Sequence, residues 1–349
     1  MKTIALVGCG RISDRHLKVI DQMPDLKLVG VCDVQPDRVE AAASTWKVPA
    51  FTDALTMVQT LKPDVVSVLT DSGSHPRMGS LLAPHVPVVV VEKPMALTLE
   101  DADHLIETCE AHGTRLFVIK QNRFNPAVQQ LRRAVDQGRF GKMVLGTVRI
   151  RWARHQAYYD QDAWRGTWKL DGGVFTNQAS HHIDLLQWLL GPVESVKSYV
   201  STRLVSIEVE DTGVAVLRFK SGALGVIEAT TATRPKDLEG SISVLGEKGS
   251  VVVGGFSVNR MVTWNFAEPS VEDEEAQKAI TDPPNVYGFG HKPFYEDMLA
   301  CLESGKRSML DGLEGRKSLE IINALYESAF TGREVHLHYV PQSVPLGRG

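Results

Sequence analysis

The chain has 349 residues and carries 38 Lys and Arg against 42 Asp and Glu, a formal net charge of −4. This mildly acidic balance lacks the electrostatic footprint of a nucleic-acid-binding domain, so we expect no nucleic-acid partner, with a local basic pocket left as an alternative. Hydrophobic residues make up 43% and charged residues 23%, which is typical of a globular protein, and the length suits two domains.

The cysteines and the apolar runs indicate the cellular compartment of the protein. No apolar run approaches the roughly 20 residues that span a bilayer, and Met1 and Lys2 lead straight into a short apolar strand without a signal-peptide pattern. We therefore expect a cytoplasmic protein with no membrane partner. We also expect no structural metal, because no CxxC pair occurs among the four cysteines, Cys9, Cys32, Cys109 and Cys301.

The first 120 residues alternate short apolar runs with amphipathic stretches. The runs are continuous in Val, Ile and Leu, which is typical of parallel strands buried on both faces. Pro36 suits the first turn of one helix, and Thr98 followed by Asp101 resembles a capping box before another. The alternation predicts a doubly wound α/β sheet with right-handed crossovers, with strands at residues 3–7, 26–32, 64–69, 88–91 and 116–119.

The pattern changes after about residue 120. Gly191-Pro192 is a strong stop signal for the second helix of this part, and Ser221-Gly222 suits a hairpin turn. Helices are predicted at residues 126–137, 177–190, 291–303 and 314–330. A mostly antiparallel sheet is predicted from strands at residues 144–152, 193–201, 212–219, 224–229, 241–245, 250–253 and 261–266.

A glycine-rich turn, GCGRIS at residues 8–13, joins the first predicted strand to the first helix. Gly8 permits the tight turn, Gly10 lets the backbone approach a pyrophosphate, and Ser13 replaces the usual Gly or Ala. Asp33 ends the second strand, 33 − 10 = 23 positions after Gly10. A carboxylate there accepts both ribose hydroxyls and repels a 2′-phosphate, so the motif predicts a dinucleotide site that prefers NAD to NADP.

Two alternatives to this interpretation stay open. Asp33 could merely cap a helix beside a glycine-rich turn that binds no nucleotide, and Arg38 could admit NADP. We predict that residues 1–120 form a NAD-binding Rossmann domain. Residues 121–349 are predicted to form an α+β domain with a mostly antiparallel open sheet, for substrate binding and oligomerisation. Residues 268–284, acidic and with three prolines, are predicted to be a mobile surface loop.

The triplet Glu92-Lys93-Pro94 follows directly after the apolar run at residues 88–91. Parallel sheets bind ligands in the crevice at the carboxyl ends of their strands, so a lysine at this position is a candidate functional residue. The alternative is a solvated lysine at a strand end.

A second candidate cluster, residues 171–184, combines two glycines with several polar side chains. If a helix begins at Asn177, then Asn177, His181 and Asp184 stand at i, i+4 and i+7 and share one face. A metal site from His181, His182 and Asp184 is disfavoured, because adjacent side chains on a helix point about 100° apart. The cluster predicts a binding face, and the alternative is a histidine that satisfies a buried hydrogen bond.

Taken together, the glycine-rich turn, the Glu92-Lys93-Pro94 triplet and the run from Gly172 to Asp184 resemble the glucose–fructose oxidoreductase / inositol dehydrogenase / MocA family over nearly the whole chain. The resemblance implies that Lys93 and His181 are a catalytic pair beside the nicotinamide. Many members carry Asp at the position of Asn177. An amide can orient a sugar hydroxyl but cannot take its proton at neutral pH.

The resemblance also implies how the protein binds its ligands and itself. It implies a homodimer or homotetramer formed through an exposed sheet face of the second domain. The implied cofactor contacts are Gly8, Gly10, Arg11, Ile12, Asp33, Thr70, His75, Glu92, Lys93 and Gln121. The implied catalytic residues are Lys93, His181 and Asn177, and the implied substrate contacts are Lys93, Arg165, Asn177 and His181.

A narrower resemblance concerns the substrate. Five segments are similar to the bacterial UDP-N-acetylglucosaminuronate 3-dehydrogenases, which implies oxidation of a sugar C3 hydroxyl during synthesis of surface polysaccharide. A diphosphate and a carboxylate need cationic partners, and Arg165, between two tryptophans, is the best candidate. The segments are KQNRFNP at 120–126, YYD at 158–160, WRGTW at 164–168, NQASH at 177–181 and DGLEGRKS at 311–318.

Two other functions remain alternatives. The chain could oxidise a free sugar or an inositol, or it could be a NAD-binding regulatory relative without catalysis. In the mechanism that the resemblance implies, His181 accepts the hydroxyl proton while hydride leaves, and Lys93 stabilises the alkoxide; the two roles could be exchanged.

Overall fold

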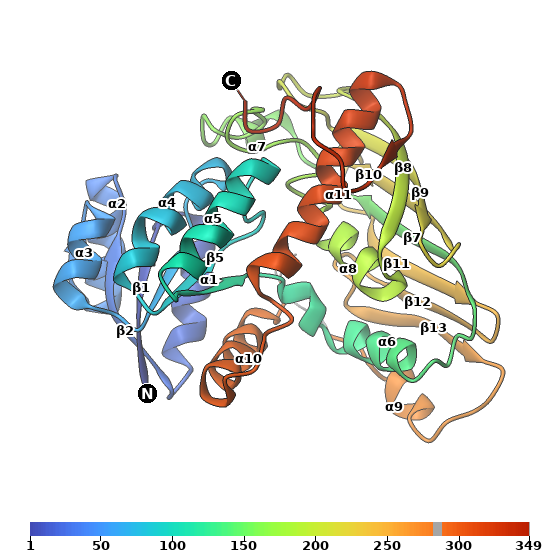
Figure 1. Ribbon diagram of the computed structural model, residues 1–349, viewed down its shortest axis with the longest axis horizontal. Helices are drawn as coiled ribbons and strands as arrows, with labels where there is room; N and C mark the ends of the chain where they lie inside the picture. The colour runs from blue at the N-terminus through green and yellow to red at the C-terminus, as the bar shows by residue number, and fades with distance from the viewer. Residues whose placement is uncertain (282–287, 349) are drawn as a thin grey trace. The chain divides into compact units, whose positions relative to one another are not determined.

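The computed structural model describes residues 1–281 and 288–348 (Figure 1). Its internal contacts divide the chain into two compact units, Met1–Ile119 with His291–Arg316, and Lys120–Gly290 with Lys317–Gly349. The boundary that we predicted after residue 120 lies next to the first division. The assignment of all later residues to the second domain is wrong in part, because His291–Arg316 belongs with the first unit.

The returning segment completes the first unit by satisfying backbone groups. The Val118 amide donates a hydrogen bond to the Leu310 carbonyl (2.7 Å), and Phe117 forms a bridge with Asp311. These contacts occupy the outer edge of a strand, whose amides and carbonyls need partners. They join residues nearly 200 positions apart, so the local sequence pattern carries no sign of them.

The first unit contains a parallel sheet with the strand order β3-β2-β1-β4-β5-β6. The order reverses between β1 and β4, which is where doubly wound sheets bind ligands. The predicted α/β fold class is confirmed, and β3 is added to the predicted strands. The strands are β1 (Lys2–Val7), β2 (Leu26–Cys32), β3 (Ala50–Phe51), β4 (Val65–Val68), β5 (Val88–Val91) and β6 (Arg115–Val118).

Helices connect these strands. The Thr98 side chain accepts a hydrogen bond from the Asp101 amide, and Pro36 begins its helix, as predicted. The last helix, α11, begins in the first unit and continues in the second. The helices are α1 (Arg11–Asp21), α2 (Pro36–Trp46), α3 (Ala54–Leu61), α4 (His75–Leu82), α5 (Leu99–Ala111), α10 (His291–Ser304) and α11 (Gly312–Thr331).

The second unit contains a mixed sheet with the strand order β13-β12-β11-β7-β10-β9-β8-β14. β7 and β10 run parallel, and the other neighbouring pairs run antiparallel, as predicted. The strands are β7 (Met143–Arg151), β8 (Val193–Ser201), β9 (Thr212–Phe219), β10 (Leu224–Thr230), β11 (Glu239–Gly246), β12 (Gly249–Gly254), β13 (Arg260–Phe266) and β14 (Val335–His336).

One face of this sheet is covered by helices of the same unit (Figure 1). Helix α8 (Ser180–Leu190) contacts β7 and β11, and α6 (Pro126–Asp136) contacts β12. The side chains of β9 alternate between buried and exposed, as expected when one face packs on a core and the other faces solvent. Two short helices, α7 (Gln156–Tyr159) and α9 (Asp273–Gln277), lie outside the sheet.

Two predictions about the second half need correction. Helix α8 begins at Ser180, three residues after the predicted start. The loop predicted at residues 268–284 contains α9, which is anchored by Asp273: its carboxylate accepts hydrogen bonds from Arg139 (2.6 Å) and Trp264 (2.7 Å). Residues 282–284 of that prediction lie outside the described residues. In residues 1–281 and 288–348, no helix combines the length and apolar character needed to cross a membrane.

Candidate functional site

The glycine-rich turn after β1 has the shape that a dinucleotide needs. Gly8 has φ +102°, and a Cβ added there would lie 2.6 Å from the Leu69 carbonyl oxygen, so only glycine fits. A Cβ added to Gly10 would meet nothing within 4 Å, which leaves the backbone open to a ligand. The Ser13 hydroxyl donates to the Gly10 carbonyl (2.5 Å), which explains how a serine fits at the third position. The turn therefore presents the start of α1 to a phosphate group.

Asp33 ties the end of β2 to this turn. Its Oδ2 accepts a hydrogen bond from the Cys9 amide (2.7 Å) and its Oδ1 accepts one from the Gln35 amide (2.8 Å). The carboxylate thus has a structural role, but it does not cap a helix as the alternative supposed, because the N-cap residue of α2 is Gln35. Two carboxylate oxygens accept about four hydrogen bonds in all, so the same group can also bind a ribose.

The loops after β4 and β5 are joined by His75. Its ring nitrogens lie 2.8 Å from the Pro94 carbonyl oxygen and 3.0 Å from the Thr70 carbonyl oxygen, and the ring is buried. Both nitrogens therefore face the protein backbone. The cofactor contacts predicted for Thr70 and His75 stay predictions, and the structure shows that His75 holds the Lys93-Pro94 loop.

Glu92 is buried next to that loop and holds it through its side-chain carboxylate. Its Oε2 accepts the Lys93 amide (2.9 Å), and its Oε1 lies 3.0 Å from His16 Nε2 and 3.6 Å from His291 Nε2. Burial by itself raises the pKa of Glu92, but the hydrogen bond with His16 and charge interactions with His16 and His291 outweigh it and hold the pKa well below its ordinary value. The carboxylate therefore orients the Lys93 backbone as an anion.

The histidines around Glu92 were missing from our sequence-based site. His16 Nδ1 also lies 2.7 Å from the Tyr295 hydroxyl. Donor atoms of His16, Glu92 and His291 lie within 4.8 Å of one another, so the set could hold a metal ion, and the prediction of no metal stays a prediction. A histidine inside the apolar stripe of α1 is the sequence signal that could have identified the cluster.

Asn177 lies in a turn before α8 and not on the helix. Its amide nitrogen donates to the Gly173 carbonyl (2.9 Å), and its side-chain amide donates to Asp171. Side-chain hydrogen bonds of this kind compete with helix formation, which explains the later start of α8. The predicted helical face that joins Asn177, His181 and Asp184 is therefore wrong.

His181 lies in the first turn of α8 and is partly exposed. The side-chain amide nitrogen of Gln121 lies 3.0 Å from its Nε2. Gln121 lies in η3 (Gln121–Phe124) and orients His181; the cofactor contact predicted for Gln121 stays a prediction.

Asp184 belongs to a buried ion-pair network, which we call the Asp184 network: Asp184, Lys120 and Arg123. Lys120 Nζ lies 2.6 Å from Oδ1, and Arg123 donates from Nε to Oδ2 and from Nη2 to Oδ1, both at 2.8 Å. Burial raises the pKa of Asp184, but the charges of Arg123 and Lys120 outweigh this effect and lower it. The network anchors α8, with His181, to the turn that carries Gln121.

Arg165 lies against two aromatic rings. Its guanidinium carbon is 4.6 Å from the Tyr158 ring centre and 4.5 Å from the Trp164 ring centre, and its Nε donates to Asp162 (3.1 Å). The aromatic contacts hold a cation in a fixed orientation. A role in binding an anion of the substrate stays a prediction.

A parallel sheet with a glycine-rich turn after β1 and an acid at the end of β2 defines a dinucleotide-binding Rossmann domain. The family model "Oxidoreductase family, NAD-binding Rossmann fold" matches residues 2–120, and the model "GFO/IDH/MocA C-terminal domain" matches residues 128–252. The chain belongs to the GFO/IDH/MocA family of oxidoreductases, which confirms the resemblance seen in its sequence. It is a NAD-dependent dehydrogenase that acts on a CH–OH group.

Solved structures and curated relatives name different substrates. The WlbA dehydrogenase from Bordetella pertussis, solved with NADH and UDP-GlcNAcA, is 43% identical, with a TM-score of 0.91 over 97% of this chain and 98% of that chain. The corresponding complex from Chromobacterium violaceum is also 43% identical, with a TM-score of 0.91 over 96% of each chain. Myo-inositol 2-dehydrogenase of Thermotoga maritima is 28% identical over 91% of this chain and 96% of its own length.

Proposed function

We propose that this dehydrogenase oxidises the C3 hydroxyl of UDP-N-acetylglucosaminuronic acid during synthesis of surface polysaccharide. The observation that carries the proposal is the 43% identity, over almost the whole of both chains, to a dehydrogenase whose structure contains NADH and UDP-GlcNAcA. The second candidate is oxidation of an inositol or free sugar, which the 28% identical myo-inositol dehydrogenase favours. We place the reaction in the cytoplasm, supported by four cysteines that are free thiols.

The residue roles form part of the same proposal. Bound NAD would supply the hydride acceptor, held by the glycine-rich turn and Asp33. His181 takes the hydroxyl proton, and its side-chain contact with Gln121 orients the ring. Lys93, whose backbone is held by Glu92, stabilises the developing alkoxide. Asn177 orients the sugar hydroxyl as a neutral amide.

Arg165 would bind an anionic group of the substrate, with a guanidinium held between Tyr158 and Trp164. A planar guanidinium suits a carboxylate or a phosphate because it donates two parallel hydrogen bonds.

A substrate panel tests the proposed function. The purified protein is mixed with NAD and either UDP-GlcNAcA, UDP-GlcNAc, glucuronate or myo-inositol, and absorbance is followed at the NADH band. UDP-GlcNAc is the matched control, because it differs from UDP-GlcNAcA in the sugar carboxylate alone. We expect UDP-GlcNAcA to give the highest kcat/KM, and NAD to exceed NADP.

The test must also detect an enzyme that keeps NADH bound after one turnover. For this purpose, NADH formation is measured in single-turnover mixtures with enzyme in excess over substrate. A higher kcat/KM with myo-inositol would establish the second candidate. Absence of cofactor reduction with every substrate, in single turnover as well, would indicate the non-catalytic relative.

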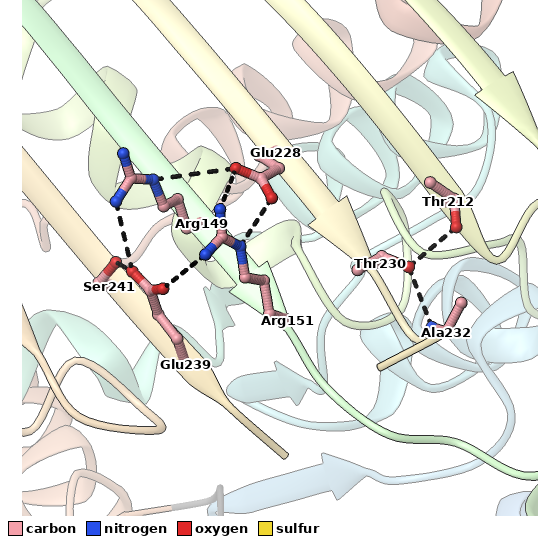
Figure 2. Close-up of polar contacts among 8 residues, drawn as sticks. All are labelled: Arg149, Arg151, Thr212, Glu228, Thr230, Ala232, Glu239 and Ser241. Atoms are coloured by element: carbon pink, nitrogen blue, oxygen red, sulfur yellow. Dashed lines mark hydrogen bonds and ion pairs between the residues drawn. The ribbon is translucent and has the colours of Figure 1, made fainter. Parts of the chain in front are cut away.

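We also propose that the protein forms a homo-oligomer through the exposed face of its second sheet, termed the open sheet face. Figure 2 shows the centre of this face, where Arg151 donates to Glu228 (2.7 Å) and to Glu239 (3.3 Å), and Arg149 lies 3.8 Å from each of the same two acids. Two cations and two anions make the cluster neutral, so it suits a second copy of itself. Exposed apolar side chains flank it at Tyr199, Val214, Val216 and Leu224.

The substitution Val216→Asp is expected to reduce the mass of the particle in light scattering. Val216 is 57% exposed, so an aspartate there leaves the fold intact but places like charges near a facing copy. Val271→Asp, at a 98% exposed position outside the sheet, is the matched control and should leave the mass unchanged. A monomeric wild-type protein, or equal masses for all three proteins, would contradict the proposed interface.

A further inference from the structure

A buried carboxylate connects the two segments that carry the proposed substrate contacts Arg165 and Asn177. Asp171 is 1% exposed. Its Oδ2 accepts a hydrogen bond from the amide of Gly166, the residue after Arg165 (2.8 Å), and its Oδ1 accepts one from the side-chain amide of Asn177. One side chain thus holds a backbone group of the first segment and a side chain of the second.

The backbone around these three groups is tightly determined. Gly166 has φ +68°, a conformation that favours glycine, and this conformation fixes the direction of its amide. The Asp171 amide donates to the Thr167 carbonyl (3.2 Å), and the Asn177 amide donates to the Gly173 carbonyl (2.9 Å). The carboxylate and the side-chain amide therefore face each other from backbone positions that are themselves hydrogen-bonded.

Asp171 determines which way the Asn177 amide faces. A carboxylate can only accept hydrogen bonds, so the atom of Asn177 that faces it must be the amide nitrogen. The amide oxygen, Oδ1, then points away from Asp171. Asn177 is partly exposed, whereas its neighbours Thr176 and Gln178 are buried, so a ligand can reach this side chain.

We propose that Asp171 is a positioning residue that turns the Asn177 amide so that its oxygen faces the substrate and accepts a hydrogen bond from a substrate hydroxyl. The proposal rests on the function proposed above, because it takes Asn177 as a substrate contact.

The hydroxyl that donates to Asn177 is a neighbour of the one that is oxidised. A hydroxyl has one proton, and in the proposed mechanism the oxidised hydroxyl gives its proton to His181. An acceptor at Asn177 therefore suits the adjacent hydroxyl, which keeps its proton throughout the reaction. Holding this neighbour fixes the rotation of the ring, so it orients the oxidised hydroxyl as well.

The substitution Asp171→Asn tests the orientation because it forces the Asn177 amide to turn. The Gly166 amide is buried and can only donate, so the new side chain must keep its oxygen there and direct its nitrogen toward Asn177. Asn177 then turns its oxygen toward position 171 and its nitrogen toward the substrate. The substrate hydroxyl loses the acceptor for its proton, and we expect kcat/KM with the best substrate of the panel to fall about tenfold.

Exchanging the two side chains should restore the arrangement. In the double variant Asp171→Asn/Asn177→Asp, the amide at position 171 accepts from Gly166 and donates to the carboxylate at position 177, which keeps an acceptor facing the substrate. The total charge of the pair is that of wild type. Asn177→Asp alone brings two carboxylates together and should lose at least as much kcat/KM as Asp171→Asn. A double variant no better than either single variant overturns the proposal.

Asn177→Ala separates the positioning role from an effect on stability or charge. Without the Asn177 amide there is nothing to orient, so adding Asp171→Asn to Asn177→Ala should leave kcat/KM unchanged. Equal losses in the two backgrounds would overturn the proposal. Asp160→Asn is the matched control: Asp160 is exposed and also accepts a side-chain amide, that of Gln156 (2.9 Å), and this variant should retain wild-type kcat/KM.

A measurement without turnover distinguishes this proposal from the proposed function. In NMR spectra of protein with isotopically labelled asparagine, the Asn177 side-chain signal is the one that Asn177→Ala removes. One of its two amide protons should exchange slowly with solvent in wild type and rapidly in Asp171→Ala. Slow exchange in a protein that turns over no substrate would refute the proposed function alone, whereas rapid exchange in an active protein would refute the role of Asp171.

Discussion

Replacement of Lys93 or His181 by alanine should lower kcat on the order of a hundred- to ten-thousand-fold, the usual contribution of a positioned acid–base or charge-stabilising group. Removing the imidazole removes the proton acceptor, and removing the ammonium leaves the developing alkoxide without a neighbouring cation. The affinity for NAD should change little, because the glycine-rich turn and Asp33 are untouched. Steady-state kinetics with the best substrate of the panel gives kcat, and a fluorescence titration gives the Kd of NAD.

Exposed residues of the same types provide the controls. Lys62→Ala and His104→Ala remove an exposed lysine and an exposed histidine from the first unit and should retain wild-type kcat. Lys93→Arg keeps the positive charge with a different shape, so it should recover part of the loss if charge stabilisation is the role of Lys93. Near wild-type turnover in both alanine variants would remove these residues from the mechanism.

The second large effect is expected in stability. Asp184→Asn should lower the free energy of unfolding by about 3–5 kcal/mol, since it leaves Lys120 and Arg123 buried without their counter-charge. The three side chains are exposed by 6% or less, so water cannot replace the carboxylate. Urea unfolding followed by circular dichroism at neutral pH measures the difference.

The pH dependence gives an independent check on the Asp184 network. The pKa of Asp184 is lowered in the folded protein from its ordinary value of 3.8 by Arg123 and Lys120, against the effect of burial. Its contribution to stability is therefore complete above this ordinary value and is lost as the pH falls further. The stability difference between wild type and Asp184→Asn should narrow in that acid range.

Asp136→Asn is the matched control for this change. Asp136 also pairs with an arginine, Arg132, but its side chain is 55% exposed. Exposed ion pairs contribute about 0–1 kcal/mol, so this variant should unfold almost like wild type. Equal losses in the two variants would contradict the role of burial in the network.

Local patterns in the sequence predicted much of the fold. The strands Leu26–Cys32 and Val88–Val91 have the predicted ends, because continuous apolar runs mark buried parallel strands. Gly191 has φ +91° at the end of α8, and Gly222 has φ +86° in the hairpin between β9 and β10, as the turn signals predicted. The strands β3 and β14 were not predicted, since two residues carry no periodicity.

The glycine-rich turn and Asp33 could also be predicted from the sequence. Their chemistry depends on residues of one βαβ unit, which lie close in the chain and have a recognisable spacing. The family followed from the same motifs together with the Glu92-Lys93-Pro94 triplet, and the family models confirm it.

The sequence by itself thus determined the α/β class, the family and the cofactor, because each depends on short segments whose pattern reflects their own local structure. Tertiary structure alone decided the burial of Asp184 and the return of His291–Arg316 to the first unit. The partners concerned are far apart in the chain, as with Asp184 and Lys120, which are 64 positions apart. Local periodicity reports whether a side chain is buried but not which distant group satisfies its charge or its hydrogen bonds.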